Sequence, residues 1–228
     1  MINWLVLNAV ILIVAYLLGA TPSGYWIGSW FYGVDIREQG SGSTGATNVL
    51  RTLGNVPALV VLVIDIFKGA LAIALVRYIY SLVFAQNLTI IAGVTDIDTA
   101  KEWMVIIAGL IAIVGHTKSI WIGFKGGKSV ASSLGILLAI SWVVGLGTLS
   151  VFIVVLTISR IVSLSSIIAA ISVSGLMFFT GQPLPYLIFA ITGGIYVIWR
   201  HISNIERLLA CKEPRIGQKL STEQKMNK

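Results

Sequence analysis

Three glycine-rich or basic segments hold the side chains that could do chemistry, and the first runs from Gly40 to Arg51. It reads GSGSTGATNVLR, with three glycines, several hydroxyls, an amide and an arginine. Glycines let backbone N–H groups approach an anion, and an arginine can hold its charge. Gly40, Gly42 and Gly45 also satisfy G-x-G-x-x-G, but that dinucleotide signature needs a βαβ unit around it. We interpret the segment as an anion-binding loop; the alternative is a flexible polar connection.

The second segment leads from Gly115-His116 to Phe124-Lys125-Gly126-Gly127-Lys128-Ser129 and then into an apolar run. Its last four residues imitate the end of a Walker A loop. That motif, however, requires glycine where Ile122 stands, and a preceding strand, so an ATPase is disfavoured. A glycine pair that opens a helix still offers free amides, the positive end of the helix dipole and the Lys128 ammonium to a phosphate. The alternative is that the segment's three lysines only set membrane topology.

The third segment, Trp199–Arg207, follows the last apolar run. His201 and Asn204 are three residues apart, which places them on one face of a helix. His201 and Glu206 imitate the His-x4-Asp dyad of another acyltransferase class, but on a helix their side chains point about 140° apart. The alternative is an aromatic and basic anchor at the membrane interface.

The elements that must position these segments are membrane-spanning helices. Of 228 residues, 57% are apolar and 11% charged, and the mean hydropathy is +0.93, which argues against a water-soluble fold. We predict one all-α, polytopic domain over residues 1–228 with seven transmembrane helices, some short or broken. The predicted spans are 4–20, 56–79, 103–115, 130–144, 146–159, 161–180 and 184–199, with a continuation of the first past Pro22 to Tyr32.

The distribution of positive charge predicts the orientation. Segments 33–54, 116–129 and 200–228 hold 12 of the 16 Lys and Arg residues, so they should be cytoplasmic, with the N-terminus outside. This requires residues 130–159 to form two short helices, and Gly145 and Gly147 mark the break. The polar loop 81–102 is then external and includes a formal glycosylation sequon at Asn87. The net charge of +7 is spread over loops that flank the membrane, which favours lipid headgroups over nucleic acid.

Two further features bear on chemistry. Asp65 and Lys68 are charged and lie three residues apart inside a predicted span. Either alone would cost about 3 kcal/mol at the bilayer centre, so we expect them to pair or to face a polar interior. Cys211 is the single cysteine, and no cluster of His, Cys and carboxylates suggests a metal site.

Together these motifs resemble the acyl-phosphate-dependent glycerol-3-phosphate acyltransferases of bacterial membranes, a seven-span family of this length. The resemblance covers nearly the whole chain and rests on four ordered motifs. They are Gly40–Arg51 with Gly54, Asp65 with Lys68-Gly69, Gly115-His116 with Phe124–Lys128 and Val130-Ala131, and Arg200-His201 with Asn204-Ile205 and Arg207-Leu208.

The resemblance implies transfer of a fatty acyl group from acyl phosphate to glycerol 3-phosphate, giving lysophosphatidic acid in the first step of phospholipid synthesis. It places the enzyme in the bacterial plasma (inner) membrane with its site toward the cytoplasm, and no metal or cofactor is needed. Acyl phosphate, glycerol 3-phosphate and membrane lipid are the expected partners. Docking of a soluble acyl-phosphate-forming enzyme on the basic loops is left open.

Carried over to this sequence, the resemblance implies a set of site residues. The expected catalytic residues are Ser41, Lys128 and His201. The expected substrate-binding residues are Gly40, Gly42, Asn48, Arg51, His116, Gly126, Gly127 and Asn204. Three serines depart from the family pattern: Ser43 replaces a usual asparagine, Ser119 a common proline, and Ser129 a third glycine.

Two other function classes compete with an acyltransferase. A transporter of a phosphorylated solute would also suit short, glycine-interrupted helices and an intramembrane charge pair. No clear inverted repeat is visible, however, and the functional-looking segments share one predicted membrane face. A lipid-binding scaffold without chemistry would tolerate Lys128→Ala and His201→Ala.

Overall fold

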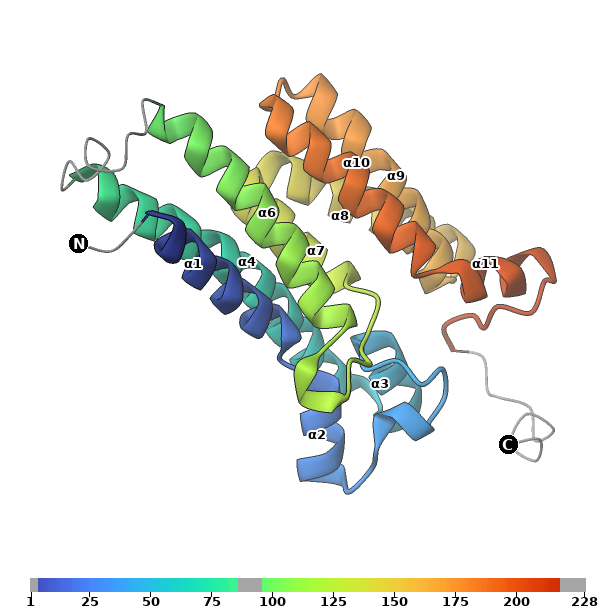
Figure 1. The fold of residues 1–228 in the computed structure, drawn as a ribbon. Helices are drawn as coiled ribbons and strands as arrows, with labels where there is room; N and C mark the ends of the chain where they lie inside the picture. Colours follow the sequence, from blue (N-terminus) through green and yellow to red (C-terminus); the bar gives the residue numbers. More distant parts are fainter. Residues whose placement is uncertain (1–3, 86–95, 218–228) are drawn as a thin grey trace.

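The computed structural model describes residues 4–85 and 96–217, and these are mostly helical (Figure 1). Asn87 and residues 218–228 of the basic tail lie outside the described residues. The helices are α1 (Trp4–Ala20), α2 (Ser23–Tyr32), α3 (Ala46–Leu53), α4 (Asn55–Ala85), α6 (Ile97–Thr117), α7 (Val130–Ile140), α8 (Trp142–Ser159), α9 (Val162–Phe179), α10 (Leu184–Trp199) and α11 (Ile202–Leu209). Short 3-10 turns lie at Ile36–Glu38 and Ile120–Ile122. Residues 4–85 and 96–217 contain no strand, only an isolated bridge between Ser119 and Lys125.

Each of the predicted apolar spans coincides with a helix, so the all-helical prediction is confirmed. By length and apolarity alone, α4, α8 and α9 could each cross a membrane. The bent pairs α1–α2 and α10–α11 raise this to up to 5 spans. The remaining predicted spans, and the orientation of the termini, stay predictions. Helix α4, with 31 residues, is about 46 Å long, more than the hydrocarbon core of about 30 Å.

The predicted break inside residues 130–159 was misplaced. Helix α7 ends at Ile140 and α8 begins at Trp142, whereas Gly145 and Gly147 lie inside α8. A methyl group on Gly145 would press on the backbone of Leu138 in α7. The glycine therefore permits close packing of two successive helices and does not end either of them.

A helix does continue past Pro22 to Tyr32, as α2, with a bend of 44° between α1 and α2; that the pair forms one span stays a prediction. Pro22 disfavours helical geometry at Thr21, which ends α1. Carbonyl groups freed by the break find side-chain donors: Ser119 Oγ lies 2.5 Å from the carbonyl oxygen of Ala20, and Lys68 Nζ lies 2.7 Å from that of Thr21. The break is thus a satisfied structural element.

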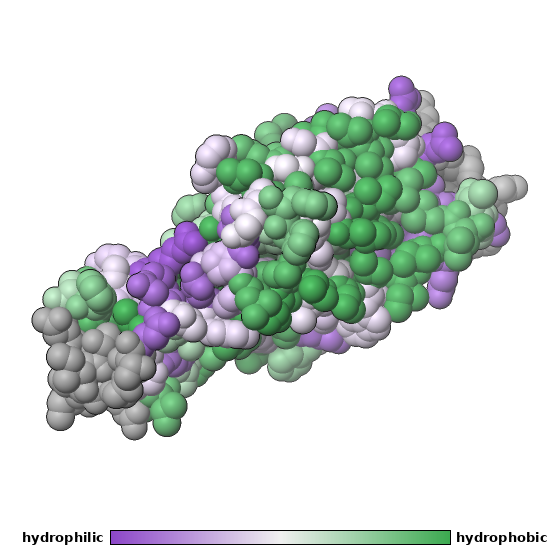
Figure 2. Space-filling model, turned by 90° about the horizontal axis from the view of Figure 1, so that it is seen from above, coloured by the Kyte–Doolittle hydropathy of each residue, from purple (hydrophilic) through white to green (hydrophobic). Residues whose placement is uncertain are grey.

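Helices pack in pairs, with α1 along α6, α4 along α7 and α8 along α9 (Figure 1). Glycines make two of these contacts close. A Cβ on Gly19 or Gly115 would overlap the opposite backbone in the α1–α6 pair, and one on Gly69 or Gly135 would do so in the α4–α7 pair. Figure 2 shows apolar side chains over the middle of the face seen from above, with hydrophilic residues toward both ends. That distribution suits a molecule embedded in lipid.

Candidate active site

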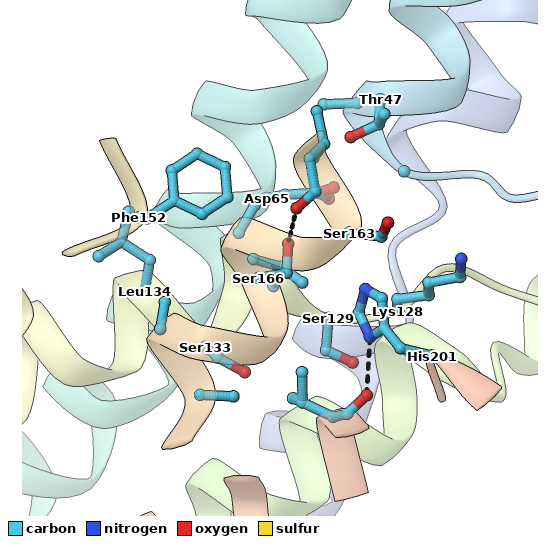
Figure 3. A pocket seen from close by; sticks show the side chains of 18 of the residues that line it. Thr47, Asp65, Lys128, Ser129, Ser133, Leu134, Phe152, Ser163, Ser166 and His201 are labelled. Carbon is cyan, nitrogen blue, oxygen red and sulfur yellow. Dashed lines mark hydrogen bonds between the residues drawn. The ribbon is translucent and has the colours of Figure 1, made fainter. Parts of the chain in front are cut away.

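A cavity of about 410 Å³ is bordered by α3, α4 and α6–α11 and combines a polar with an apolar wall. Lys128 and His201 lie beside one another at one side, and Leu134 and Phe152 lie at the other (Figure 3). Phe189 and Val173 extend the apolar wall. Such a cavity can hold an amphiphile with an anionic head and a hydrocarbon tail.

The Gly40–Gly45 loop is held in shape by Asn48, which lies on the following helix, α3. Asn48 Nδ2 lies 3.0 Å from the Ile36 carbonyl oxygen, 3.0 Å from that of Gln39 and 2.9 Å from that of Ser43. Its Oδ1 accepts the Ser41 N–H at 2.8 Å. Although Asn48 was predicted to bind substrate, its amide is engaged with the loop backbone, so we assign it to holding the loop in shape.

The loop and α3 bring the predicted residues Ser41 and Arg51 to the cavity, whereas Gly40 and Gly42 shape the loop and do not line the cavity. Gly40 and Gly42 have φ of 55° and 69°, left-handed values that favour glycine. Ser41 lines the cavity, and its side chain is exposed. Arg51, on α3, also lines the cavity, and its guanidinium makes no hydrogen bond or ion pair with residues 4–85 or 96–217. Arg51 therefore presents a cation with free donors to any ligand.

The second predicted loop turns from α6 into α7 through left-handed residues. Phe124 has φ of 59° and Ser129 φ of 61°. Ser129 stands immediately before α7, and its hydroxyl donates to the Ile113 carbonyl oxygen at 3.2 Å. A left-handed conformation explains why glycine suits this position, and the hydroxyl contact compensates in part for the cost of a side chain there.

Gly126 and Gly127 rest directly on His116 at the end of α6. The Gly127 N–H donates to the His116 carbonyl oxygen at 3.2 Å. A Cβ on Gly127 would overlap Nε2 of His116, and one on Gly126 would overlap the His116 carbonyl oxygen. Arg200, which was not predicted as a site residue, also holds this loop: its Nη2 donates to the Gly127 carbonyl oxygen at 3.2 Å.

Lys128 extends from this loop into the cavity and donates to Oδ1 of Asn204. Burial lowers the pKa of Lys128 to about 8, and the cation of Arg207 lowers it further while Glu213 raises it. An ammonium with two remaining donors in a partly buried place is an effective partner for a phosphate. This hydrogen bond joins two expected site residues that lie 76 positions apart in the sequence.

His201 lies at the turn between α10 and α11, which bend by 60°. The single helix that we expected through His201 and Asn204 is therefore broken. His201 is buried, and its Nδ1 lies 2.7 Å from the Val197 carbonyl oxygen, which must accept (Figure 3). Burial lowers the pKa of His201 to about 4, so the ring is neutral and Nε2 can accept a hydrogen bond. Glu206 is exposed, whereas the buried His201 ring is hydrogen-bonded to Val197, which argues against the alternative dyad.

Glu213 is a site residue that the sequence did not reveal. Its Oε1 accepts from Asn204 Nδ2 at 2.6 Å and from Ser163 Oγ at 2.8 Å, and its Oε2 lies 2.7 Å from Arg207 Nε. Burial opposes ionisation, but these three partners together hold the pKa of Glu213 below its ordinary value. The carboxylate thereby orients the Asn204 amide toward Lys128. An acidic residue in a basic stretch was the only available signal.

The chain matches the family model for glycerol-3-phosphate acyltransferase over residues 9–211. A glycerol-3-phosphate acyltransferase of Nostoc sp. is 60% identical over 96% of both chains. One of Acaryochloris marina is 57% identical over 95% of both chains. The chain belongs to the glycerol-3-phosphate acyltransferase family. The family resemblance stated from the motifs is therefore confirmed, and the protein is an acyltransferase.

Two solved structures of this acyltransferase family share the fold. Both are described as PlsY (YgiH), an integral membrane glycerol 3-phosphate acyltransferase. The glycerol 3-phosphate form aligns with a TM-score of 0.77 and 34% identity, covering 96% of this chain and 99% of that one. The lysophosphatidic acid form aligns with a TM-score of 0.75 and 35% identity, covering 92% and 95%. The acyltransferase is accordingly an integral membrane protein.

Proposed function

We propose that this acyltransferase moves a fatty acyl group from acyl phosphate to glycerol 3-phosphate, releasing lysophosphatidic acid and inorganic phosphate. The observation that carries the proposal is the cavity, which places Arg51, Lys128, His201 and Asn204 against an apolar wall. Both proposed substrates carry a phosphate, and the donor also carries a hydrocarbon chain. The solved PlsY forms with glycerol 3-phosphate and lysophosphatidic acid support the same acceptor and product.

In the proposed reaction the primary hydroxyl oxygen of glycerol 3-phosphate attacks the acyl carbonyl carbon. The bond between that carbon and the phosphate oxygen breaks, and phosphate leaves. Lys128 binds the donor phosphate and stabilises the charge on it as it departs, whereas the Gly127 N–H is already donated to the His116 carbonyl oxygen. Ser41 orients the donor. Arg51, His201 and Asn204 bind glycerol 3-phosphate and aim its hydroxyl. No covalent enzyme intermediate is required, because acyl phosphate is already activated.

The hydroxyl proton must also find an acceptor. His201 Nε2 has a lone pair, because Nδ1 donates its proton to Val197. With a pKa of about 4, however, this imidazole is a weak base. A phosphate oxygen, with a second pKa near 6, is the stronger acceptor. We therefore assign the proton to a substrate phosphate and the orientation of the hydroxyl to His201.

The proposal includes a membrane placement. Seven spans, an external N-terminus and a cytoplasmic site would put the three site segments on the face where phosphorylated metabolites are made. The concentration of Lys and Arg in those segments supports this arrangement. The bacterial plasma membrane is the proposed location, and the reaction is the proposed first step of phospholipid synthesis.

The test is product formation by the purified protein. Labelled glycerol 3-phosphate is supplied with acyl phosphate, acyl-CoA or acylated acyl-carrier protein in parallel. We expect labelled lysophosphatidic acid from acyl phosphate alone. Product from the thioesters and none from acyl phosphate would overturn the proposed donor. Addition of a soluble acyl-phosphate-forming enzyme then tests docking, since a docked pair would outpace the same enzymes separated by a dialysis membrane.

A further inference from the structure

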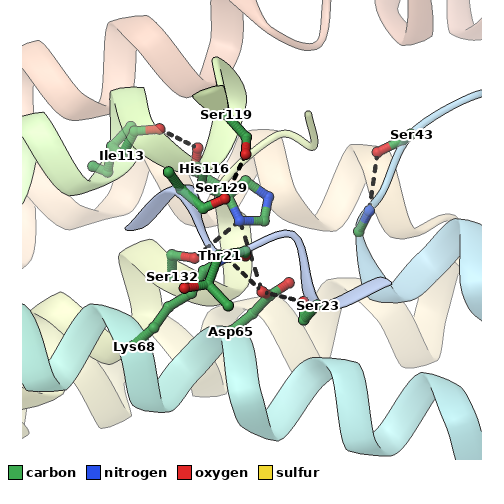
Figure 4. Close-up of polar contacts among 12 residues, drawn as sticks. Thr21, Ser23, Ser43, Asp65, Lys68, Ile113, His116, Ser119, Ser129 and Ser132 are labelled. Carbon is green, nitrogen blue, oxygen red and sulfur yellow. Dashed lines mark hydrogen bonds and ion pairs between the residues drawn. The ribbon is translucent and has the colours of Figure 1, made fainter. Parts of the chain in front are cut away.

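A second polar cluster is buried between the α1–α2 break, α4, α6 and α7. Two of its members, Asp65 and the expected substrate-binding residue His116, also border the cavity, but the proposed reaction gives the cluster no step. Asp65, Lys68 and His116 are 1%, 4% and 6% exposed. Figure 4 shows their side chains converging with those of Ser23 and Ser132. Charged groups are expensive in such a position, so the cluster needs a role that outweighs the cost.

Asp65 and Lys68 neutralise one another and tie the α1–α2 break to α4. Asp65 Oδ1 lies 2.9 Å from Lys68 Nζ and accepts from Ser23 Oγ at 2.7 Å. Lys68 Nζ also donates to the Thr21 carbonyl oxygen at 2.7 Å. The pair is therefore satisfied without a ligand.

His116 connects this cluster to the loop that carries Lys128. Its Nδ1 lies 3.3 Å from Ser132 Oγ, a hydrogen bond from α7 that orients the ring, while Asp65 Oδ1 on α4 lies 3.8 Å away, beyond hydrogen-bond distance (Figure 4). The opposite ring nitrogen, Nε2, faces the Cα of Gly127, where a methyl group would not fit. The imidazole thus fills the space beneath the loop.

We propose that His116, oriented by Ser132, is a positioning residue that sets the place of the Gly126–Gly127 backbone and hence of Lys128. Phosphate binding demands donors placed within about 0.5 Å, and a flexible glycine pair does not supply that placement by itself. The His116 ring beneath Gly127 and the Arg200 hydrogen bond to the Gly127 carbonyl oxygen together restrict the movement of the loop. The inference rests on the proposed function only for the identity of the phosphate ligand.

A double-mutant cycle tests the proposal. Gly127→Ala places a methyl group against the His116 ring, and we expect it to weaken binding of inorganic phosphate, measured by calorimetry on the purified protein. In the background of His116→Ala the obstacle is gone, so Gly127→Ala should cost at least about tenfold less affinity than it does alone. Gly126→Ala is the matched control, because its methyl group meets the His116 carbonyl oxygen, which His116→Ala retains.

The result expected is rescue of Gly127→Ala and no rescue of Gly126→Ala. Additive effects, or equal rescue of both glycine variants, would overturn the proposal. If His116→Ala does not fold, His116→Ser removes the ring and keeps a hydroxyl near Asp65. The melting temperatures of the same variants, measured without phosphate, report the contact between the His116 ring and Gly127 independently of any ligand. Failure of the proposed acyl transfer in the wild-type protein would therefore be distinguishable from failure of this inference.

Discussion

The two polar clusters of the acyltransferase meet at the Gly126–Lys128 loop and treat their charges in opposite ways. In the buried cluster, the Asp65 and Lys68 charges are paired and hydrogen-bonded within the protein. In the cavity, the Arg51 guanidinium has no hydrogen-bond partner among the described residues, and Lys128 has Asn204 Oδ1. A satisfied charge holds helices together, whereas a cation with spare donors is prepared for an anionic ligand.

The largest expected effect comes from removing the ammonium of Lys128 in the cavity. We expect Lys128→Met to lower kcat/KM for acyl transfer on the order of 1000-fold, because it removes the charge that stabilises the departing phosphate. Its thermal stability should stay near that of the wild type, since no carboxylate is left unpaired. Lys118→Met, an exposed lysine of the same segment, is the control and should retain full activity. Equal activity of both variants would remove Lys128 from the mechanism.

The paired charges of Asp65 and Lys68 should affect stability instead. Asp65→Asn leaves Lys68 buried without a counter-charge and should lower the free energy of unfolding by about 3 kcal/mol. Adding Lys68→Met restores neutrality and should recover most of the loss. Asp98 and Lys101 have the same three-residue spacing, but Asp98 is 80% exposed, so Asp98→Asn should cost less than about 0.5 kcal/mol. Denaturant unfolding in detergent measures all of these, and an unrecovered double variant would contradict the pairing.

A pH titration of phosphate binding distinguishes Lys128 from the paired charges, because its ammonium loses a proton near pH 8. Since Lys128 has a pKa of about 8, it is charged below pH 8, and affinity for inorganic phosphate should fall about tenfold per pH unit above it. Between the folded value near 8 and the ordinary 10.5, the unfolded chain binds this proton more tightly, so stability should rise with pH there. Lys128→Arg keeps its charge throughout, and calorimetry on it should show no such fall. A fall of equal slope in both would point to another group.

The smallest effect concerns the left-handed residue after Lys128. Ser129→Gly removes backbone strain but also the hydroxyl contact to Ile113, and the two effects nearly cancel. We expect stability within about 1 kcal/mol of the wild type and activity within about twofold. Ala131→Gly, one residue inside α7, lacks the compensation and should cost about 1 kcal/mol. Thermal unfolding of the two variants decides whether the conformation at residue 129 is the reason that glycine suits it.

Much of the fold was predictable because apolar runs and prolines report directly on helices in a membrane. The site was less so. Asn48 looked like a ligand, since nothing local shows that its amide turns back to its own loop. The bend at His201 was missed because no proline or glycine marks it. Glu213 was missed because its partners, Asn204 and Ser163, are brought to it only by the fold.

The glycine contacts between helices have a consequence for how this sequence can vary. At Gly19, Gly69, Gly115 and Gly135 a single methyl group would meet main-chain atoms of the facing helix, which cannot rotate away as a side chain can. A saturation mutagenesis screen scored by growth would therefore show intolerant positions far from the cavity, and these would report helix spacing and not catalysis. Mutational freedom in this enzyme is concentrated on the side chains that face lipid, where one hydrocarbon surface substitutes for another.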